Sequence, residues 1–196
     1  MTSEDGRRPE SPEAAGPSDA SLFGLRLLRA PAFGSGAHET TSSCLAMFES
    51  HPPPPGAHVL DWGAGTGILA LAALRLGAGR AIALDIEADA TRACRSNAAI
   101  NGLSGRMMVV RGSIDCVRER SAFGLVTANI HGDLILAGGR ALAGHVAPGG
   151  TLIVSGLRFE EDFSARKLFE GLGLTALRRV FLSEYVTQVW KRERKD

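Results

Sequence analysis

Glycines at alternate positions, Gly63, Gly65 and Gly67, closely follow an apolar stretch that ends in Asp61. Glycine adopts positive φ with little strain and lets a ligand approach the bare backbone, so the pattern predicts a binding turn between a strand and a helix. Residues 68–76 have the apolar spacing of that helix. Its N-terminal amides and partial positive charge are expected to face oxygen atoms of a ligand.

The spacing of these glycines separates two classes of cofactor. A dinucleotide fingerprint, G-x-G-x-x-G, requires a last glycine where this chain has Ile68. The G-x-G-x-G spacing suits a ligand that presents a carboxylate, as S-adenosylmethionine (SAM) does. Asp85 ends the next apolar segment, where an acid can accept hydrogen bonds from both ribose hydroxyls. The turn and Asp85 together predict a SAM site; the alternative is a tight turn and a solvated acid.

Polar residues also follow the third and fourth expected strands, 107–110 and 123–130. Ligands of open parallel sheets bind at the carboxyl ends of the strands. Asp115, in the turn after the third strand, either accepts a hydrogen bond from an adenine amino group or caps a short helix. Asn129 is placed to orient a nucleophile by accepting its hydrogen. His131 is either a proton acceptor or a helix cap.

A glycine-rich loop, 32–41, precedes a helix expected at 41–49, with Thr40 or Thr41 near its N-cap. Phe33 and His38 stand among small residues there. We interpret the segment as a functional loop, with a simple connection as the alternative.

Composition excludes several classes of protein. The chain has 196 residues, a net charge of +1 and 44% hydrophobic residues, which is ordinary for a globular domain and too weakly basic to favour a nucleic-acid partner. The three cysteines lack metal-ligand spacing, so we expect buried thiols, no metal site and a reducing compartment. With no signal peptide or apolar membrane span, a cytoplasmic protein with no membrane association is expected.

Strands and helices alternate over residues 58–156, and two β stretches end the chain. This order predicts the α/β class: a doubly wound, mainly parallel, seven-stranded Rossmann-like sheet with a terminal antiparallel hairpin. Residues 1–20 lack large apolar side chains after the first methionine and are expected to be a disordered tail. Residues 21–196 are expected to form one domain, which begins with a short strand or arm.

Four blocks of this sequence together resemble the bacterial PrmA family, which methylates lysines and the amino terminus of a large-subunit ribosomal protein. The blocks are 32–41, 59–70, 83–86 with 97–102, and 128–130. The resemblance implies that Thr41, Gly63, Asp85 and Asn129 bind SAM and that Phe33 and His38 lie on a loop closing over it. The chain departs from the family pattern at Trp62 and His131, and the short tail stands in place of the family's N-terminal recognition domain.

The sequence therefore predicts a class I SAM-dependent methyltransferase that acts on lysine or amino-terminal nitrogens of a protein, ribosomal proteins included. The alternatives are a nucleic-acid or small-molecule methyltransferase and a noncatalytic SAM-binding partner subunit. Asn129 and His38 are the expected catalytic residues. The expected cofactor-binding residues are Phe33, Thr41, Asp61, Gly63, Gly65, Gly67, Asp85, Ile86, Ser113, Asp115 and Asn129.

Overall fold

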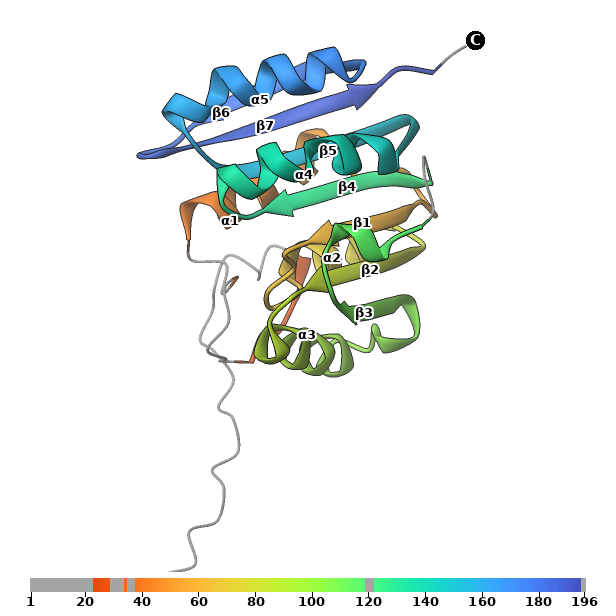
Figure 1. The fold of residues 1–196 in the computed structure, drawn as a ribbon. Coiled ribbons are helices and arrows are strands. Elements are labelled where there is room, and N and C mark those ends of the chain that lie inside the picture. Colours follow the sequence, from red (N-terminus) through yellow and green to blue (C-terminus); the bar gives the residue numbers. More distant parts are fainter. Residues whose placement is uncertain (1–22, 29–33, 35–37, 119–121, 195–196) are drawn as a thin grey trace, which may run out of the picture.

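A seven-stranded sheet forms the centre of the computed structural model, which describes residues 23–28, 34, 38–118 and 122–194. The strand order is β3-β2-β1-β4-β5-β7-β6 (Figure 1). Strands β1 to β5 are parallel, whereas β7 runs antiparallel to both β5 and β6. The expected doubly wound sheet and its terminal hairpin are confirmed.

The strands are β1 (His58–Trp62), β2 (Arg80–Asp85), β3 (Met107–Arg111), β4 (Phe123–Asn129), β5 (Val146–Arg158), β6 (Leu174–Phe181) and β7 (Tyr185–Arg192). The helices are α1 (Glu39–Ser50), α2 (Ile68–Arg75), α3 (Ala88–Ile100), α4 (Gly132–His145) and α5 (Phe159–Gly171). Two short 3-10 turns, η2 (Ser104–Arg106) and η3 (Ile114–Cys116), flank β3.

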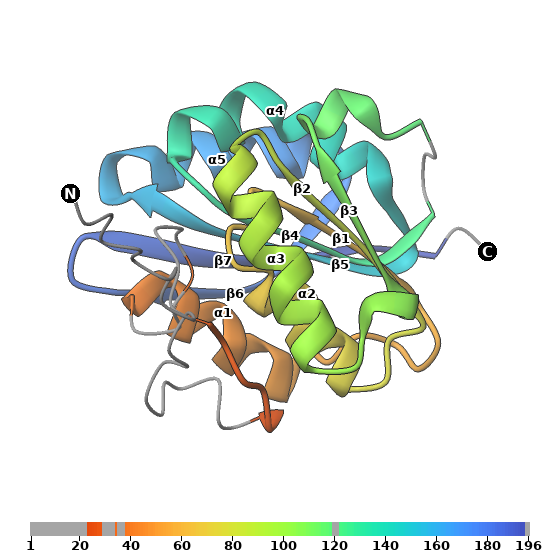
Figure 2. The same cartoon turned by 90° about the horizontal axis from the view of Figure 1, so that it is seen from below.

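Helices cover both faces of the sheet, because successive side chains of a buried strand point to opposite sides. In β1, Val59 packs into the core under α1, α2 and α3, and Leu60 packs into the core under α4 and α5. Figure 2 shows α4 and α5 on one side of the sheet and α1 and α2 on the other.

Element boundaries partly match the expectations. Helix α3 spans the expected residues and stops at Asn101 and Gly102. Helix α1 begins earlier than expected, because His38 caps it in place of Thr40 or Thr41: the His38 side chain accepts a hydrogen bond from the Thr40 amide. Strand β5 runs well beyond the expected 151–155 in both directions.

The arm at residues 23–28 is held by Asn97 of α3 and by Asn101, which caps the end of that helix. Leu25 and Leu27 are buried, which agrees with an ordered arm in this region. The Asn101 side chain accepts a hydrogen bond from the Arg26 amide and donates one to the Arg26 carbonyl. The Asn97 side chain accepts one from the Leu28 amide. The expected disordered tail, residues 1–20, lies outside the described residues.

One expectation about the cysteines is wrong. Cys44 and Cys94 are buried, but Cys116 is exposed, because η3 turns its side chain away from the core. Within the described ranges, no three histidine, cysteine or acidic residues are grouped to hold a metal ion. Among the same residues, no helix has the length and apolar character to span a membrane.

Candidate active site

A cavity of about 600 Å³ opens at the carboxyl ends of β1, β2 and β4. The strand order reverses between β1 and β4, which is where open α/β sheets bind their ligands. The residues that line it come from all parts of the chain: His38, Thr40, Trp62, Gly63, Gly65, Asp85, Ile86, Glu87, Asp89, Ala90, Ser113, Asn129, Ile130, His131, Leu134, Gly156 and Tyr185.

The glycine turn forms one wall of this cavity and is tied to β2. The amides of Gly63 and Ala64 both donate to the Leu84 carbonyl, at 2.8 and 2.9 Å. Gly63 has a φ of 71°, and a Cβ there would lie 2.1 Å from Cγ2 of Ile130, so a side chain is excluded. Gly67 faces the core instead, where a Cβ would lie 2.6 Å from Sγ of Cys94. Gly63 and Gly65 are therefore the glycines of this turn that meet the cavity.

Asp85 connects the turn to the end of β2. Its Oδ2 accepts a hydrogen bond from the Gly65 amide at 2.8 Å, and its Oδ1 accepts one from the Glu87 amide at 2.9 Å. A carboxylate has about four lone-pair positions, so these two bonds leave acceptor capacity on a group that lines the cavity. Asp85 is thus held rigidly while it presents an acidic acceptor to a ligand.

Asp61 lies behind the turn. Its carboxylate accepts hydrogen bonds from the Thr127 hydroxyl at 2.7 Å and the Ala70 amide at 3.3 Å, and it is 1% exposed. Burial raises the pKa of the Asp61 carboxyl to about 6, against the lowering effect of both hydrogen bonds, and the charge of Asp85 raises it further. Asp61 is not among the residues that line the cavity.

Asn129 ends β4 and lines the same cavity as Asp85. Its Nδ2 donates a hydrogen bond to Oγ1 of Thr41 at 3.1 Å, and Thr41 is buried beneath the cavity while its neighbour Thr40 lines it. Because the amide nitrogen is engaged with Thr41, the amide oxygen is the group that Asn129 can offer to an N–H donor.

His38 and Tyr185 stand together at the mouth of the cavity. The two ring centroids are 5.9 Å apart, and Nδ1 of His38 is 2.8 Å from Oγ1 of Thr40. The hairpin that carries Tyr185 is joined to α1, because Glu39 accepts hydrogen bonds from the amide and the hydroxyl of Ser183. These bonds lower the pKa of Glu39. The contact holds the hairpin turn against the start of α1, beside the cavity.

Comparison with known proteins identifies the family. The model of the ribosomal protein L11 methyltransferase (PrmA) family matches residues 17–168. The chain belongs to the PrmA family. A ribosomal protein L11 methyltransferase from Pelotomaculum thermopropionicum is 44% identical over 149 residues, which are 76% of this chain and 47% of the relative. The chain thus spans about half the length of the curated relatives it matches.

Solved structures agree with the PrmA assignment. The crystal structure of a ribosomal protein L11 methylase from Lactobacillus delbrueckii subsp. bulgaricus is 26% identical, with a TM-score of 0.74 over 83% of this chain and 81% of that one. An RNA methyltransferase from Salinibacter ruber, solved with S-adenosyl-L-homocysteine, is 17% identical, with a TM-score of 0.59 over 79% of this chain and 93% of that one. The second likeness shows the fold alone.

In this PrmA chain the expected site residues fall into four groups. The structure brings His38, Gly63, Gly65, Asp85, Ile86, Ser113 and Asn129 together around the cavity. Thr41, Asp61 and Gly67 lie behind its wall, and Asp115 lines a neighbouring cavity of about 450 Å³ between η3 and α4. Phe33 lies outside the described residues. The roles of all these residues toward a cofactor stay predictions.

Sequence reasoning missed several lining residues. Tyr185 and Gly156 come from the C-terminal third, and the position of Tyr185 depends on how the hairpin meets α1. The signal for Tyr185 is weak, although it is the one tyrosine of the chain. Trp62 lines both cavities and forms part of the wall between them.

Proposed function

We propose that this chain binds SAM in the 600 Å³ cavity and transfers its methyl group to a lysine or amino-terminal nitrogen of a protein, with ribosomal protein L11 as the substrate. The observation that carries the proposal is the convergence of Gly63, Asp85 and Asn129 from three strand ends on one cavity at the switch point. Membership of the PrmA family supports the same activity. A ribosomal substrate would place the activity in the cytoplasm.

The residues present fit this cofactor. The volume falls within the roughly 300–1,000 Å³ that is usual for small-molecule sites. Asp85 offers a carboxylate for hydroxyl groups, and the acidic Glu87 and Asp89 beside it suit a ligand with positive charge. When bound, SAM supplies an electrophilic methyl group, so the protein has to place a nucleophile and exclude water.

The chain's own residues can prepare an amine for attack. A lysine with its usual pKa of roughly 10.4 is neutral in only about one molecule in a few thousand at pH 7, and the neutral form alone has a lone pair. Trp62, Ile130 and Leu134 give the cavity an apolar wall, which favours the neutral amine through desolvation. The Asn129 oxygen then orients the amine by accepting its hydrogen. We assign His38, at the mouth, as the residue that receives the released proton.

Labelled SAM tests the proposal. Purified ribosomal protein L11 is incubated with the chain and methyl-labelled SAM, and the modified residues are found by mass spectrometry. We expect label on lysine or amino-terminal nitrogens of L11. Label on RNA in a cell extract with none on L11 would favour a nucleic-acid methyltransferase. Tight SAM binding by calorimetry with no transfer to any extract component would indicate a noncatalytic subunit.

A further inference from the structure

Three phenylalanine side chains are exposed close together at the start of α5 and the end of β6. Phe159, Phe163 and Phe181 are 46%, 69% and 57% exposed, and the ring centroids of Phe159 and Phe181 are 6.0 Å apart. Phe159 and Phe163 are four residues apart, so they share one face of the helix. We call these three residues the Phe cluster. Exposed apolar side chains that gather in this way mark interaction surfaces.

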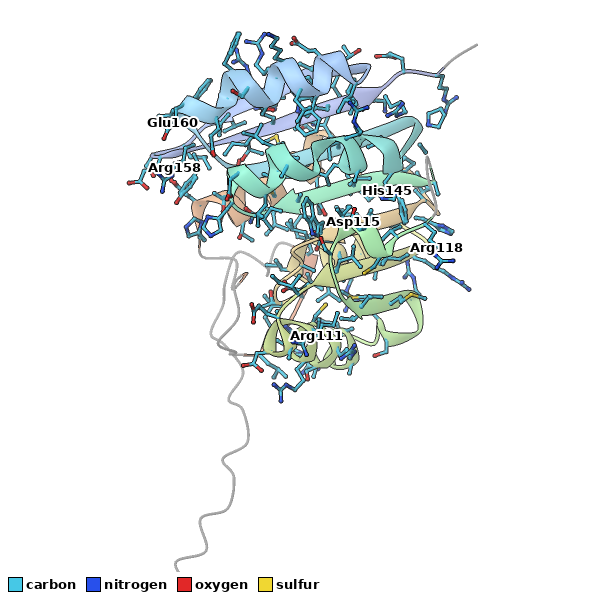
Figure 3. The ribbon with its side chains drawn as sticks, viewed as in Figure 1. Arg111, Asp115, Arg118, His145, Arg158 and Glu160 are labelled. Carbon is cyan, nitrogen blue, oxygen red and sulfur yellow. The ribbon has the colours of Figure 1, made fainter. Side chains whose placement is uncertain are left out.

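The Phe cluster is continuous with the mouth of the cavity. Tyr185, which lines the cavity, pairs across the sheet with Arg158, and Phe159 is the next residue of the chain. Phe181 pairs with Val186, so its side chain lies on the α5 face of the sheet, opposite to that of Tyr185. The first turn of α5 also meets the cavity wall at Gly132, where a Cβ would collide with the Glu161 carboxylate, and Gly132 follows His131, which lines the cavity. Figure 3 shows Arg158 and Glu160 at the same end of the sheet, far from Arg118 and His145 at the other end. A substrate segment bound over the Phe cluster can therefore extend into the cavity.

The charges around the Phe cluster favour a basic partner. Glu160, Glu161 and Asp162 form the first turn of α5, and Glu184 is exposed in the hairpin turn. Arg179, which lies 5.6 Å from the ring of Phe181, is paired with Asp162 at 2.8 Å. That ion pair offsets one local positive charge, and Arg158 beside Phe159 adds another. Glu160, Glu161 and Glu184 still leave an excess of acid, which repels a phosphate backbone and attracts lysines.

We propose that the Phe cluster docks the segment of the protein substrate that flanks the methylated amine. The segment is extended and basic, and it places an apolar side chain on the cluster while the target amine enters the cavity beside His131. The proposal rests on the proposed function, since it assumes a protein substrate. Apolar side chains at the centre of an interface commonly contribute most of its binding energy.

Kinetics on purified L11 test the proposal, with labelled SAM as methyl donor. The variants are Phe163→Ala and the double change Phe159→Ala with Phe163→Ala. Met108→Ala is the matched control, because Met108 is 61% exposed on β3 at the opposite edge of the sheet. We expect the double variant to raise KM for L11 by about tenfold, with kcat within about twofold and SAM affinity unchanged. Met108→Ala should change none of the three values.

The outcomes separate this proposal from the proposed function. If the wild-type chain transfers no label to L11, the proposed function is overturned and the docking proposal with it. If the wild type labels L11 and the double variant keeps its KM, the docking proposal alone is overturned. A loss of SAM affinity together with the rise in KM would show a structural role instead. A wild-type dimer that Phe163→Ala dissociates would also overturn it, because the cluster would then lie between two copies.

Discussion

The indole ring of Trp62 occupies the space that a side chain at Gly138 would need. A Cβ at Gly138 would lie 2.5 Å from Cη2 and 2.6 Å from Cζ3 of that ring. Trp62 is 8% exposed and lines the candidate active site, so the ring cannot move out of the way without disturbing the cavity. The large residue at the end of β1 and the small residue in α4 are therefore coupled.

We expect Gly138→Ala to lower the free energy of unfolding by about 1 kcal/mol, because overpacking against Trp62 outweighs the roughly 1 kcal/mol that alanine gains in a helix. In a Trp62→Val background the same change should stabilise the protein. Urea denaturation of the four variants measures the coupling, which we expect to be about 2 kcal/mol. Gly171→Ala is the control, since a Cβ there meets nothing within 4 Å. Additive effects of the two substitutions would refute the coupling.

Thiol reactivity should distinguish the three cysteines. Burial raises the pKa of the Cys44 and Cys94 thiols to about 12, and both side chains are buried, whereas Cys116 is exposed. Because the thiolate is the reactive form, a disulfide reagent should modify one thiol in the native protein and three in denaturant. Cys116→Ser should remove the native reaction. Rapid native modification of all three would show that the core opens easily.

Asp61 should make stability fall as the pH rises. Its folded-state pKa of about 6 lies above its ordinary value of 3.8, so the folded chain binds more protons than the unfolded chain between these values. The contribution of this group to the free energy of unfolding is highest below pH 4, and it decreases by roughly 3 kcal/mol as the pH rises to about 6. Asp61→Asn should flatten this part of the profile and be more stable than the wild type at pH 8. If urea denaturation gives the two proteins the same dependence of unfolding free energy on pH, the raised pKa of Asp61 is contradicted.

Asp85 is expected to support both the cofactor and the turn. Asp85→Ala should weaken SAM binding by about 1–3 kcal/mol, the usual range for hydrogen bonds to a charged group, and also loosen Gly65, whose amide it accepts. Asp89→Ala is the comparison, since Asp89 lines the same cavity but pairs with Arg92 in solvent. Calorimetry and thermal unfolding give both values. Unchanged SAM affinity in a folded Asp85→Ala protein would place the ribose elsewhere.

Local patterns predicted the fold well because each strand, turn and helix has its own signal. The pair Asn101 and Gly102 correctly predicted where α3 ends, and the spacing of the glycines correctly predicted the turn after β1. The site was harder, because a strand end fixes where a residue lies and not which way its side chain turns. Asp61 and Thr41 lie near the cavity but point into hydrogen bonds behind it.

Long-range contacts account for what the sequence did not reveal. Tyr185 reaches the cavity because the hairpin turn binds Glu39, 144 residues earlier in the chain. No local spacing records that contact. The start of α1 was misplaced for a related reason: His38 is an uncommon cap, and the usual preference for threonine pointed to its neighbours.

Asn129 should matter more for turnover than for binding. Asn129→Ala removes the oxygen proposed to orient the amine, an interaction that strengthens in the transition state. We expect kcat to fall by about 10² to 10³, which corresponds to roughly 3–4 kcal/mol, while SAM affinity falls by less than about tenfold. Steady-state rates on L11 and calorimetry with SAM separate the two effects. Wild-type turnover by Asn129→Ala would leave the residue as structural.

Thr41 should act through Asn129, because its hydroxyl accepts the amide hydrogen that fixes the orientation of the side chain. Thr41→Val should reduce kcat by about tenfold with little change in SAM affinity, and Thr41→Ser, which keeps the hydroxyl, should restore it. Added to Asn129→Ala, Thr41→Val should cost nothing further, since the two residues form one unit. His38→Ala and His131→Ala complete the series. If a histidine is the essential base, its alanine variant should lose as much rate as Asn129→Ala and recover part of that rate at high pH. We expect this behaviour from His38→Ala and not from His131→Ala.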